Sequence, residues 1–147
     1  MIQISNPKLA LANYRIHGLG VFAKEPIHEV ELVVTFSGPV FTEAPLYPEV
    51  DNLCEIRPGY WLGPSGYEDD AINHSCDPNC ELDVHSLELR ALLDIPPGEE
   101  ITYDYAGVIH DDWVIECTCG AADCRGYIRK RPIRQGRAGE SQTSAVG

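Results

Sequence analysis

Basic residues are scarce in this sequence before residue 125, and that scarcity argues against nucleic acid as a partner. Residues 1–124 hold 5 Lys and Arg against 22 Asp and Glu, whereas residues 125–147 hold 6 basic residues and 1 acidic residue. An acidic body repels nucleic acid and attracts cationic peptides or proteins, or it serves solubility alone. The basic residues at 129–137 are interpreted as a solvated, frayed end and not as a contact for a phosphate backbone.

Long apolar runs are also missing. No stretch approaches the roughly 20 apolar residues of a membrane span, and the first residues lack the basic start and apolar core of a signal peptide. We therefore expect an intracellular protein, cytoplasmic if bacterial and nuclear or cytoplasmic if eukaryotic or viral. Whether it is a monomer or a homodimer stays open.

Long helical patterns are absent as well. The 13 Gly and 11 Pro are scattered along 147 residues, which favours one domain of short strands and turns. The expected fold class is all-β, with one helical turn over 68–72. The expected strands cover residues 30–36, 53–56, 60–62, 82–84, 87–93 and 100–105. Those over 53–56 and 60–62 flank a turn at 57–59, and those over 82–84 and 87–93 form a strand pair. Residues 39–53, with three prolines and no clear period, are expected to be an irregular insert, and the chain after Tyr105 is expected to be loop-like down to the cysteine cluster.

Three of the six cysteines lie within eight residues, as Cys117, Cys119 and Cys124. Cys-x-Cys is poor disulfide spacing, and a chain of this length does not need disulfide bonds to fold. Structural zinc takes four Cys or His ligands, so one ligand must come from elsewhere. Cys76 and Cys80 are the candidates. Redox-active or incidental cysteines are the alternative, and the apolar surroundings of Cys54 indicate a buried, inert thiol.

The stretch 73–80, Asn-His-Ser-Cys-Asp-Pro-Asn-Cys, combines an amide, an imidazole and two thiols. Neither a core strand nor a surface helix requires that mixture. A cysteine nucleophile, Cys76, with His74 as its base is one reading, but no cysteine-hydrolase signature surrounds it. His74 could also be an ordinary, hydrogen-bonded core residue.

Tyr103 and Tyr105 are two residues apart in the expected strand over 100–105. Side chains at i and i+2 of a strand share a face, so both phenols should point the same way. An aromatic core face is the default interpretation of such a pair. Because buried hydroxyls need partners, a polar internal site is the alternative.

Taken together, four stretches resemble the SET-domain protein lysine methyltransferases between Tyr14 and Gly126. The stretch 18–23 looks like the family's Gly-x-Gly cofactor motif, and 73–79 is similar to its most specific signature. The stretch 98–105 resembles the catalytic motif, and 117–126 resembles the post-SET zinc motif.

This resemblance implies a β-clip fold of small curved sheets with a C-terminal pseudoknot and a post-SET zinc loop. The implied division is a lead-in over 1–13, a SET domain over 14–106, a post-SET zinc segment over 107–128 and a flexible basic tail over 129–147. The implied cofactors are S-adenosylmethionine and Zn²⁺. The implied metal ligands are Cys76, Cys117, Cys119 and Cys124.

The resemblance also assigns roles within the site. Gly18, Leu19, Gly20, Asn73 and His74 would bind the cofactor, His74 through its backbone, and Tyr60 would line the cofactor pocket. Tyr105 would be the catalytic phenol.

Tyr103 occupies a position where the family carries Phe or Tyr. A Tyr hydroxyl there, with a bound water, occupies the space that a second methyl group needs. The implied activity is therefore methyl transfer to a lysine of a basic protein, histone-like or otherwise, with a bias to monomethylation.

One departure from the family pattern tells against this assignment. Asp70 and Ala71 stand where the family often has Arg and Phe, so an acid replaces a base near the expected cofactor site. A non-catalytic SET-like module that binds a basic peptide or the cofactor is the alternative function.

Overall fold

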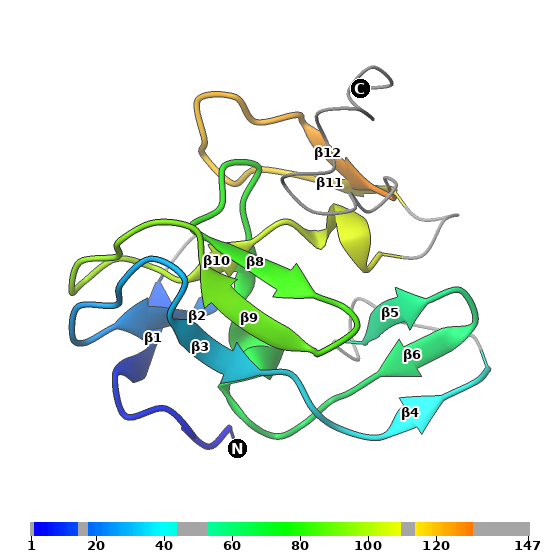
Figure 1. Ribbon diagram of the computed structural model, residues 1–147. Helices are drawn as coiled ribbons and strands as arrows, with labels where there is room; N and C mark the ends of the chain where they lie inside the picture. Colours follow the sequence, from blue (N-terminus) through cyan, green and yellow to red (C-terminus); the bar gives the residue numbers. More distant parts are fainter. Residues whose placement is uncertain (1, 15–17, 44–52, 110–113, 131–147) are drawn as a thin grey trace.

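The computed structural model describes residues 2–14, 18–43, 53–109 and 114–130. Within these ranges the chain forms short strands and two single-turn 3-10 helices (Figure 1). In chain order the elements are β1 (Leu9–Tyr14), β2 (Gly18–Ala23), β3 (Leu32–Thr35), β4 (Val40–Phe41), β5 (Cys54–Arg57), β6 (Tyr60–Leu62), η1 (Glu68–Ala71), β7 (Asn73–His74), β8 (Cys80–Asp83), β9 (Glu88–Ala91), β10 (Thr102–Tyr103), η2 (Tyr105–Gly107), β11 (Val114–Glu116) and β12 (Tyr127–Arg129).

The strands form several small sheets instead of one large sheet. Two sheets have three strands, in the orders β3-β9-β8 and β4-β6-β5, and three are two-stranded, β1-β2, β7-β10 and β11-β12. In Figure 1 the β11–β12 hairpin lies at the top and the β4-β6-β5 sheet at the lower right, on either side of the β3-β9-β8 sheet. Each sheet is too small to be stable alone, so stability depends on packing the sheets together.

Alternating apolar residues from the different sheets build a common core. Val21 of β2 and Leu89 of β9 are fully buried, as is Ile101 just before β10. Backbone hydrogen bonds join the sheets where these residues meet, for example from the Ile101 N–H to the Val21 carbonyl at 2.8 Å. The core therefore fixes the strand β2 against the strand β10.

The pairing that places the site is parallel and spans a long stretch of chain. Asn73 and His74 of β7 pair with Thr102 and Tyr103 of β10. Asn79 strengthens this junction, because its Oδ1 accepts from the Thr102 N–H at 2.9 Å and its Nδ2 donates to the Glu100 carbonyl at 2.8 Å. The stretches 73–80 and 98–105 are thereby held side by side.

Much of the expected secondary structure is confirmed. The chain is all-β with little helix, β5 and β6 form the hairpin around residues 57–59, and β8 and β9 form an antiparallel pair. The expected helical turn is η1. The β11–β12 hairpin was not expected, because the chain after Tyr105 was expected to be loop-like down to the cysteine cluster.

The expected strand over 100–105 is wrong at its end. β10 covers only Thr102–Tyr103, and Tyr105 begins η2. Asp104 causes the change of direction, because its side chain accepts a hydrogen bond from the Ala106 N–H at 2.9 Å and caps the 3-10 turn. Most of the insert over 39–53 and most of the basic tail lie outside the described residues, as do residues 15–17.

None of the described residues form a helix long and apolar enough to span a membrane.

Candidate active site and metal centre

Hydrogen bonds fix both the side-chain hydroxyl and the backbone N–H of Tyr105. Its hydroxyl donates to the Ile72 carbonyl at 2.6 Å, and its N–H donates to His74 Nδ1 at 3.0 Å. The His74 and Tyr105 rings meet edge to face, with centroids 5.3 Å apart. These contacts fix the phenol beside the end of β7.

Tyr103 lies deeper and is 4% exposed. Its ring centroid is 5.0 Å from that of Tyr105 and 5.4 Å from that of Phe36. The hydroxyl contacts Cys54 Sγ at 3.7 Å. Burial raises the pKa of Tyr103 well above its usual value, and Cys54, Tyr105 and Asp69 act in the same direction, so the hydroxyl is neutral.

The two phenols do meet, but not for the reason that the sequence suggested. They are not on one face of a continuous strand, because Tyr105 belongs to η2. The turn capped by Asp104 brings the second ring back against the first. The tilt between the rings is 52°, which is not the parallel arrangement of neighbours on a pleated strand.

Asn73 joins the glycine-containing strand to this region. Its Nδ2 donates to the Leu19 carbonyl at 3.0 Å and to Glu100 Oε2 at 2.8 Å. Gly18, at the start of β2, has φ of +72°, a backbone conformation that favours glycine. The structure therefore brings Asn73 to the Gly18–Gly20 segment, as the sequence predicts for a shared binding site.

Tyr60 has a more exposed place. It lies on β6, is 37% exposed, and its ring stacks under the Arg57 guanidinium at 4.1 Å. This is a cation–π contact on the sheet surface. A role for Tyr60 in cofactor binding stays a prediction.

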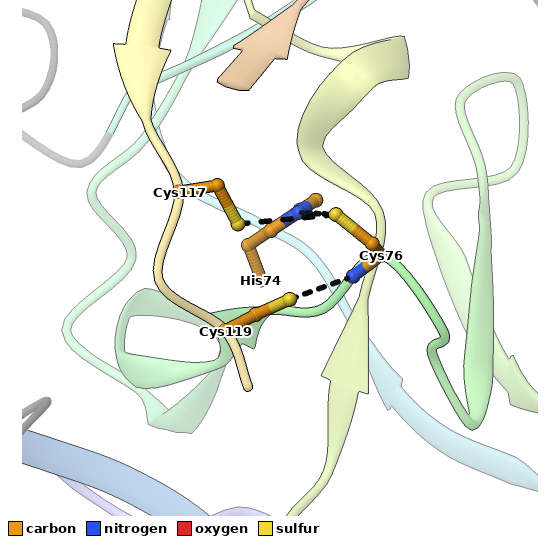
Figure 2. Close-up of side chains that lie close together, drawn as sticks. All are labelled: His74, Cys76, Cys117 and Cys119. Carbon is orange, nitrogen blue, oxygen red and sulfur yellow. Dashed lines mark hydrogen bonds between the residues drawn. The ribbon is translucent and has the colours of Figure 1, made fainter. Parts of the chain in front are cut away.

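Four ligand-type side chains converge between β7 and the β11–β12 hairpin (Figure 2). One nitrogen of His74 and the sulfur atoms of Cys76, Cys117 and Cys119 all lie within 4.8 Å of one another. The Cys76 and Cys117 sulfur atoms are 3.8 Å apart. Zinc–sulfur bonds of about 2.3 Å in a tetrahedron place two sulfur atoms roughly 3.8 Å apart, so the spacing fits zinc.

Cys124 lies close to this group, but its sulfur is not one of the four ligand atoms that all lie within 4.8 Å of one another. Its sulfur contacts the Cys117 carbonyl at 3.7 Å and interacts with the Cys117 and Cys119 thiols. In the compact set its place is taken by His74, whose Nε2 is 3.4 Å from Cys76 Sγ. Because His74 Nδ1 accepts from the Tyr105 N–H, a neutral His74 carries its proton on Nε2, the nitrogen that faces Cys76, and in that form it does not bind a metal through Nε2. Cys124 as the fourth ligand therefore stays a prediction. Cys80 is buried on β8.

The electrostatics of Cys119 suit a metal ligand. Burial opposes ionisation of its thiol, but the N–H groups of Cys76 and Ala121 and the neighbouring thiols lower the pKa of Cys119 to about 6. A thiolate is the form that binds metal. Burial instead raises the pKa of Cys76, and it raises the pKa of Cys117 to about 12, so Cys119 is the thiol of this set that ionises most readily.

An ion pair missed in the sequence couples the metal region to the tyrosines. Arg125 donates to both oxygens of Asp104, at 2.9 and 2.8 Å. Burial opposes ionisation of Asp104, yet Arg125 and the Ala106 N–H lower its pKa. The opposite charges at these two positions were visible in the sequence, but nothing local indicated that residues 21 apart would pair.

The departure at Asp70 and Ala71 has a structural explanation. Asp70 accepts from the backbone N–H groups of Ser65 and Gly66, at 2.9 and 2.7 Å. Its carboxylate therefore stabilises the turn before η1. Ala71 is buried in the core.

Two hollows lie near these residues. A cavity of about 10 Å³ is lined by Phe36, Ser37, Cys54, Leu62, Gly63, Asp69 and Asp70. A wider, open hollow of about 530 Å³ runs along β3 beside residues 5–7, and no predicted site residue lines it.

The arrangement agrees with known proteins. The family model for the SET domain matches residues 18–106. The Caenorhabditis elegans histone-lysine N-methyltransferase set-2 is 36% identical over 142 residues, covering 82% of this chain and 9% of that protein. The Schizosaccharomyces pombe histone-lysine N-methyltransferase, H3 lysine-4 specific, is 34% identical over 136 residues, covering 78% of this chain and 14% of that protein.

Solved structures agree as well. KRYPTONITE in complex with mCHH DNA, H3(1–15) peptide and SAH superposes with a TM-score of 0.63 and 28% identity, covering 82% of this chain and 29% of that chain. The chain thus spans a small part of the longer proteins that it matches. The glycine-containing β2, the paired β7 and β10 and the family match over 18–106 lead to one assignment: the chain belongs to the SET-domain family.

Proposed function

We propose that this protein is a protein-lysine N-methyltransferase that transfers a methyl group from S-adenosylmethionine to a lysine of a basic protein. The observation that carries the proposal is the parallel pairing of β7 with β10. Around this pairing, the Asn73 amide donates to the Leu19 carbonyl, and the turn capped by Asp104 sets the Tyr105 ring against that of Tyr103. The names of the relatives and the SAH and H3 peptide bound to KRYPTONITE support it.

Gly18–Gly20, Asn73 and the backbone of His74 would hold the cofactor. When bound, the cofactor supplies an electrophilic methyl group on a positively charged sulfur. The residues of this chain then align the acceptor amine with that methyl group, and alignment supplies much of the rate. Tyr105 suits this positioning role because its hydroxyl is fixed by the Ile72 carbonyl.

The acceptor lysine must be neutral to attack. With an ordinary pKa of about 10.4, its deprotonation at pH 7 costs roughly 4–5 kcal/mol. Apolar burial lowers an amine pKa, and the cationic sulfur of the cofactor adds to that effect. The paired rings of Tyr103 and Tyr105 supply apolar walls that also tolerate a methylated cation.

A basic protein is the proposed substrate class because the body of the chain is acidic. Complementary charge speeds association and selects partners. The relatives named for histone-lysine methylation favour a histone-like protein within that class.

The proposed zinc site has a structural role. Cys76, Cys117 and Cys119, with Cys124 as the proposed fourth ligand, would tie the β11–β12 hairpin to the end of β7. Zinc there would hold the C-terminal β11–β12 hairpin against the proposed active site.

The test is transfer of labelled methyl from S-adenosylmethionine to core histones and to a host lysate. Wild type should label a protein band, and Tyr105→Phe should lose at least about 100-fold of that rate, as expected for a positioned catalytic group. Tyr127→Phe is the matched control, since Tyr127 is 55% exposed on β12. Cofactor binding without transfer by wild type would instead favour the non-catalytic module.

Product specificity is tested separately. The proposed monomethylation bias depends on the neutral hydroxyl of Tyr103, so Tyr103→Phe should shift the product toward dimethyl-lysine. Mass spectrometry of the modified substrate measures the shift. An unchanged product distribution in an active variant would contradict the bias.

A further inference from the structure

The hydroxyl of Tyr103 has one described side-chain partner, and it is a cysteine. Cys54 Sγ, at the start of β5, lies 3.7 Å from the Tyr103 hydroxyl oxygen. That is a sulfur hydrogen-bond distance. The residues are 49 apart in sequence, so the contact is created by the packing of the β4-β6-β5 sheet on β10.

Space is available immediately behind this contact. Cys54 and Phe36 both line the cavity of about 10 Å³, and Phe36 also packs edge-on against the Tyr103 ring. A cavity of this size is at the lower limit for one water molecule. Removing the thiol would therefore enlarge a space into which the phenol could move.

We propose that Cys54 is a positioning residue for product specificity, which holds the Tyr103 hydroxyl in the space that a second methyl group needs. The inference rests on the proposed function and extends it to a residue outside the family motifs. Cys54 acts through Tyr103 and needs no contact with substrate.

The protonation states suit this role. Burial raises the pKa of Cys54 to about 11, and the Asp69 and Asp70 carboxylates act in the same direction. Burial likewise raises the pKa of Tyr103. Both groups are therefore neutral near pH 7, so a directional O–H and S–H contact orients the hydroxyl without placing a charge beside the acceptor amine.

The test compares the dimethyl-to-monomethyl product ratio at equal total methyl incorporation. Cys54→Ala should raise that ratio about fivefold, which corresponds to about 1 kcal/mol, the usual size of one hydrogen bond. Cys54→Ser retains a polar partner and should stay within about twofold of wild type. Cys80→Ala is the matched control, because Cys80 is a buried core thiol on β8.

The decisive comparison is made in the Tyr103→Phe background. There the hydroxyl is gone, so Cys54→Ala should change the product ratio by less than about twofold. An equal rise in both backgrounds would show that Cys54 acts through volume alone and would overturn the proposal. A rise with Cys80→Ala as large as that with Cys54→Ala would overturn it too.

Urea unfolding of wild type, the two single variants and the double variant separates this inference from the proposed function. The double-mutant cycle should show a favourable coupling between Cys54 and the Tyr103 hydroxyl, whatever the activity. Zero coupling would overturn the inference while leaving methyl transfer intact. Absence of transfer by wild type would instead overturn the proposed function, and the specificity role with it.

Discussion

At the residue scale, three consecutive acids in η1 take different partners. Glu68 accepts hydrogen bonds from Ser5 and Asn6 near the N-terminus, and Asp70 caps the Ser65–Gly66 turn. Asp69 is 8% exposed, accepts from Ser65 and Ser37, and has no ion pair among the described residues. Similar side chains in one short segment thus differ because the tertiary contacts around each differ.

Asp69 should make stability depend on pH. Burial raises the pKa of Asp69 from 3.8 to about 6, so the folded state holds its proton more tightly than the unfolded state. The contribution of Asp69 to the free energy of unfolding is fully present below about pH 4 and is lost as the pH rises through about 6. The loss amounts to up to about 3 kcal/mol. Relative to that of wild type, the free energy of unfolding of Asp69→Asn should therefore rise by up to that amount between about pH 4 and 7. Urea unfolding measures the difference.

Asp83 provides a control of opposite sign. The N–H groups of His85 and Ser86 lower its pKa, so its contribution is lost as the pH falls. Relative to that of wild type, the free energy of unfolding of Asp83→Asn should therefore fall as the pH rises from about 3 toward 7. A pH-independent difference between Asp69→Asn and wild type would contradict the expected effect of burial.

At the element scale, η2 shows how one capping residue redirects the chain. Asp104 ends β10, caps η2 through the Ala106 N–H, and binds Arg125 just before β12. The position of Tyr105 is therefore coupled to the hairpin that carries three of the candidate metal ligands, Cys117, Cys119 and Cys124.

Replacing Arg125 should loosen that coupling. Arg125→Lys keeps the charge but loses the two-pronged geometry, and the pair is partly buried, so we expect a cost of about 1 kcal/mol. Hydrogen exchange should rise across residues 114–130 more than across β8 and β9. Arg90→Lys, which alters the more exposed Arg90–Glu88 pair, should cost less than about 0.5 kcal/mol. Equal effects of the two substitutions would contradict a coupling role for Arg125.

At the scale of the whole molecule, the candidate metal site joins segments that are far apart in sequence. Cys76 and Cys117 are separated by 41 residues, yet their sulfur atoms are in contact. An ion bound there would hold the β11–β12 hairpin, which has a small hydrophobic cluster of its own around Ile109 and Ile128. The hairpin therefore depends on both the metal and this cluster.

Removal of the metal should release the hairpin first. After chelation we expect a lower melting temperature, faster trypsin cleavage at Arg125, Arg129 or Lys130, and lost methyl transfer, all restored by zinc. The free energy of metal binding contributes directly to folding, so removing the metal destabilises the folded hairpin. Cys119→Ser should reproduce the chelated state, whereas Cys80→Ser should keep its metal. A chelated protein with unchanged melting and cleavage would argue against a structural metal.

Local sequence patterns were enough to predict the all-β class, the β5–β6 and β8–β9 pairs and the stretches that make the site. Turn residues and strand periodicity are local signals, and three thiols clustered in one short loop are typical of a metal site. The strand expected through Tyr105 failed because propensity could not show that Asp104 would cap a turn.

Which distant groups meet was settled by tertiary packing alone. The contacts of Asn73 with Leu19, of Tyr103 with Cys54 and of Arg125 with Asp104 join residues 54, 49 and 21 positions apart. The entry of His74 into the compact metal cluster likewise depends on how β7 faces the β11–β12 hairpin. Such contacts follow from the packing of several small sheets on one core, and that packing has no signature in any single stretch of the chain.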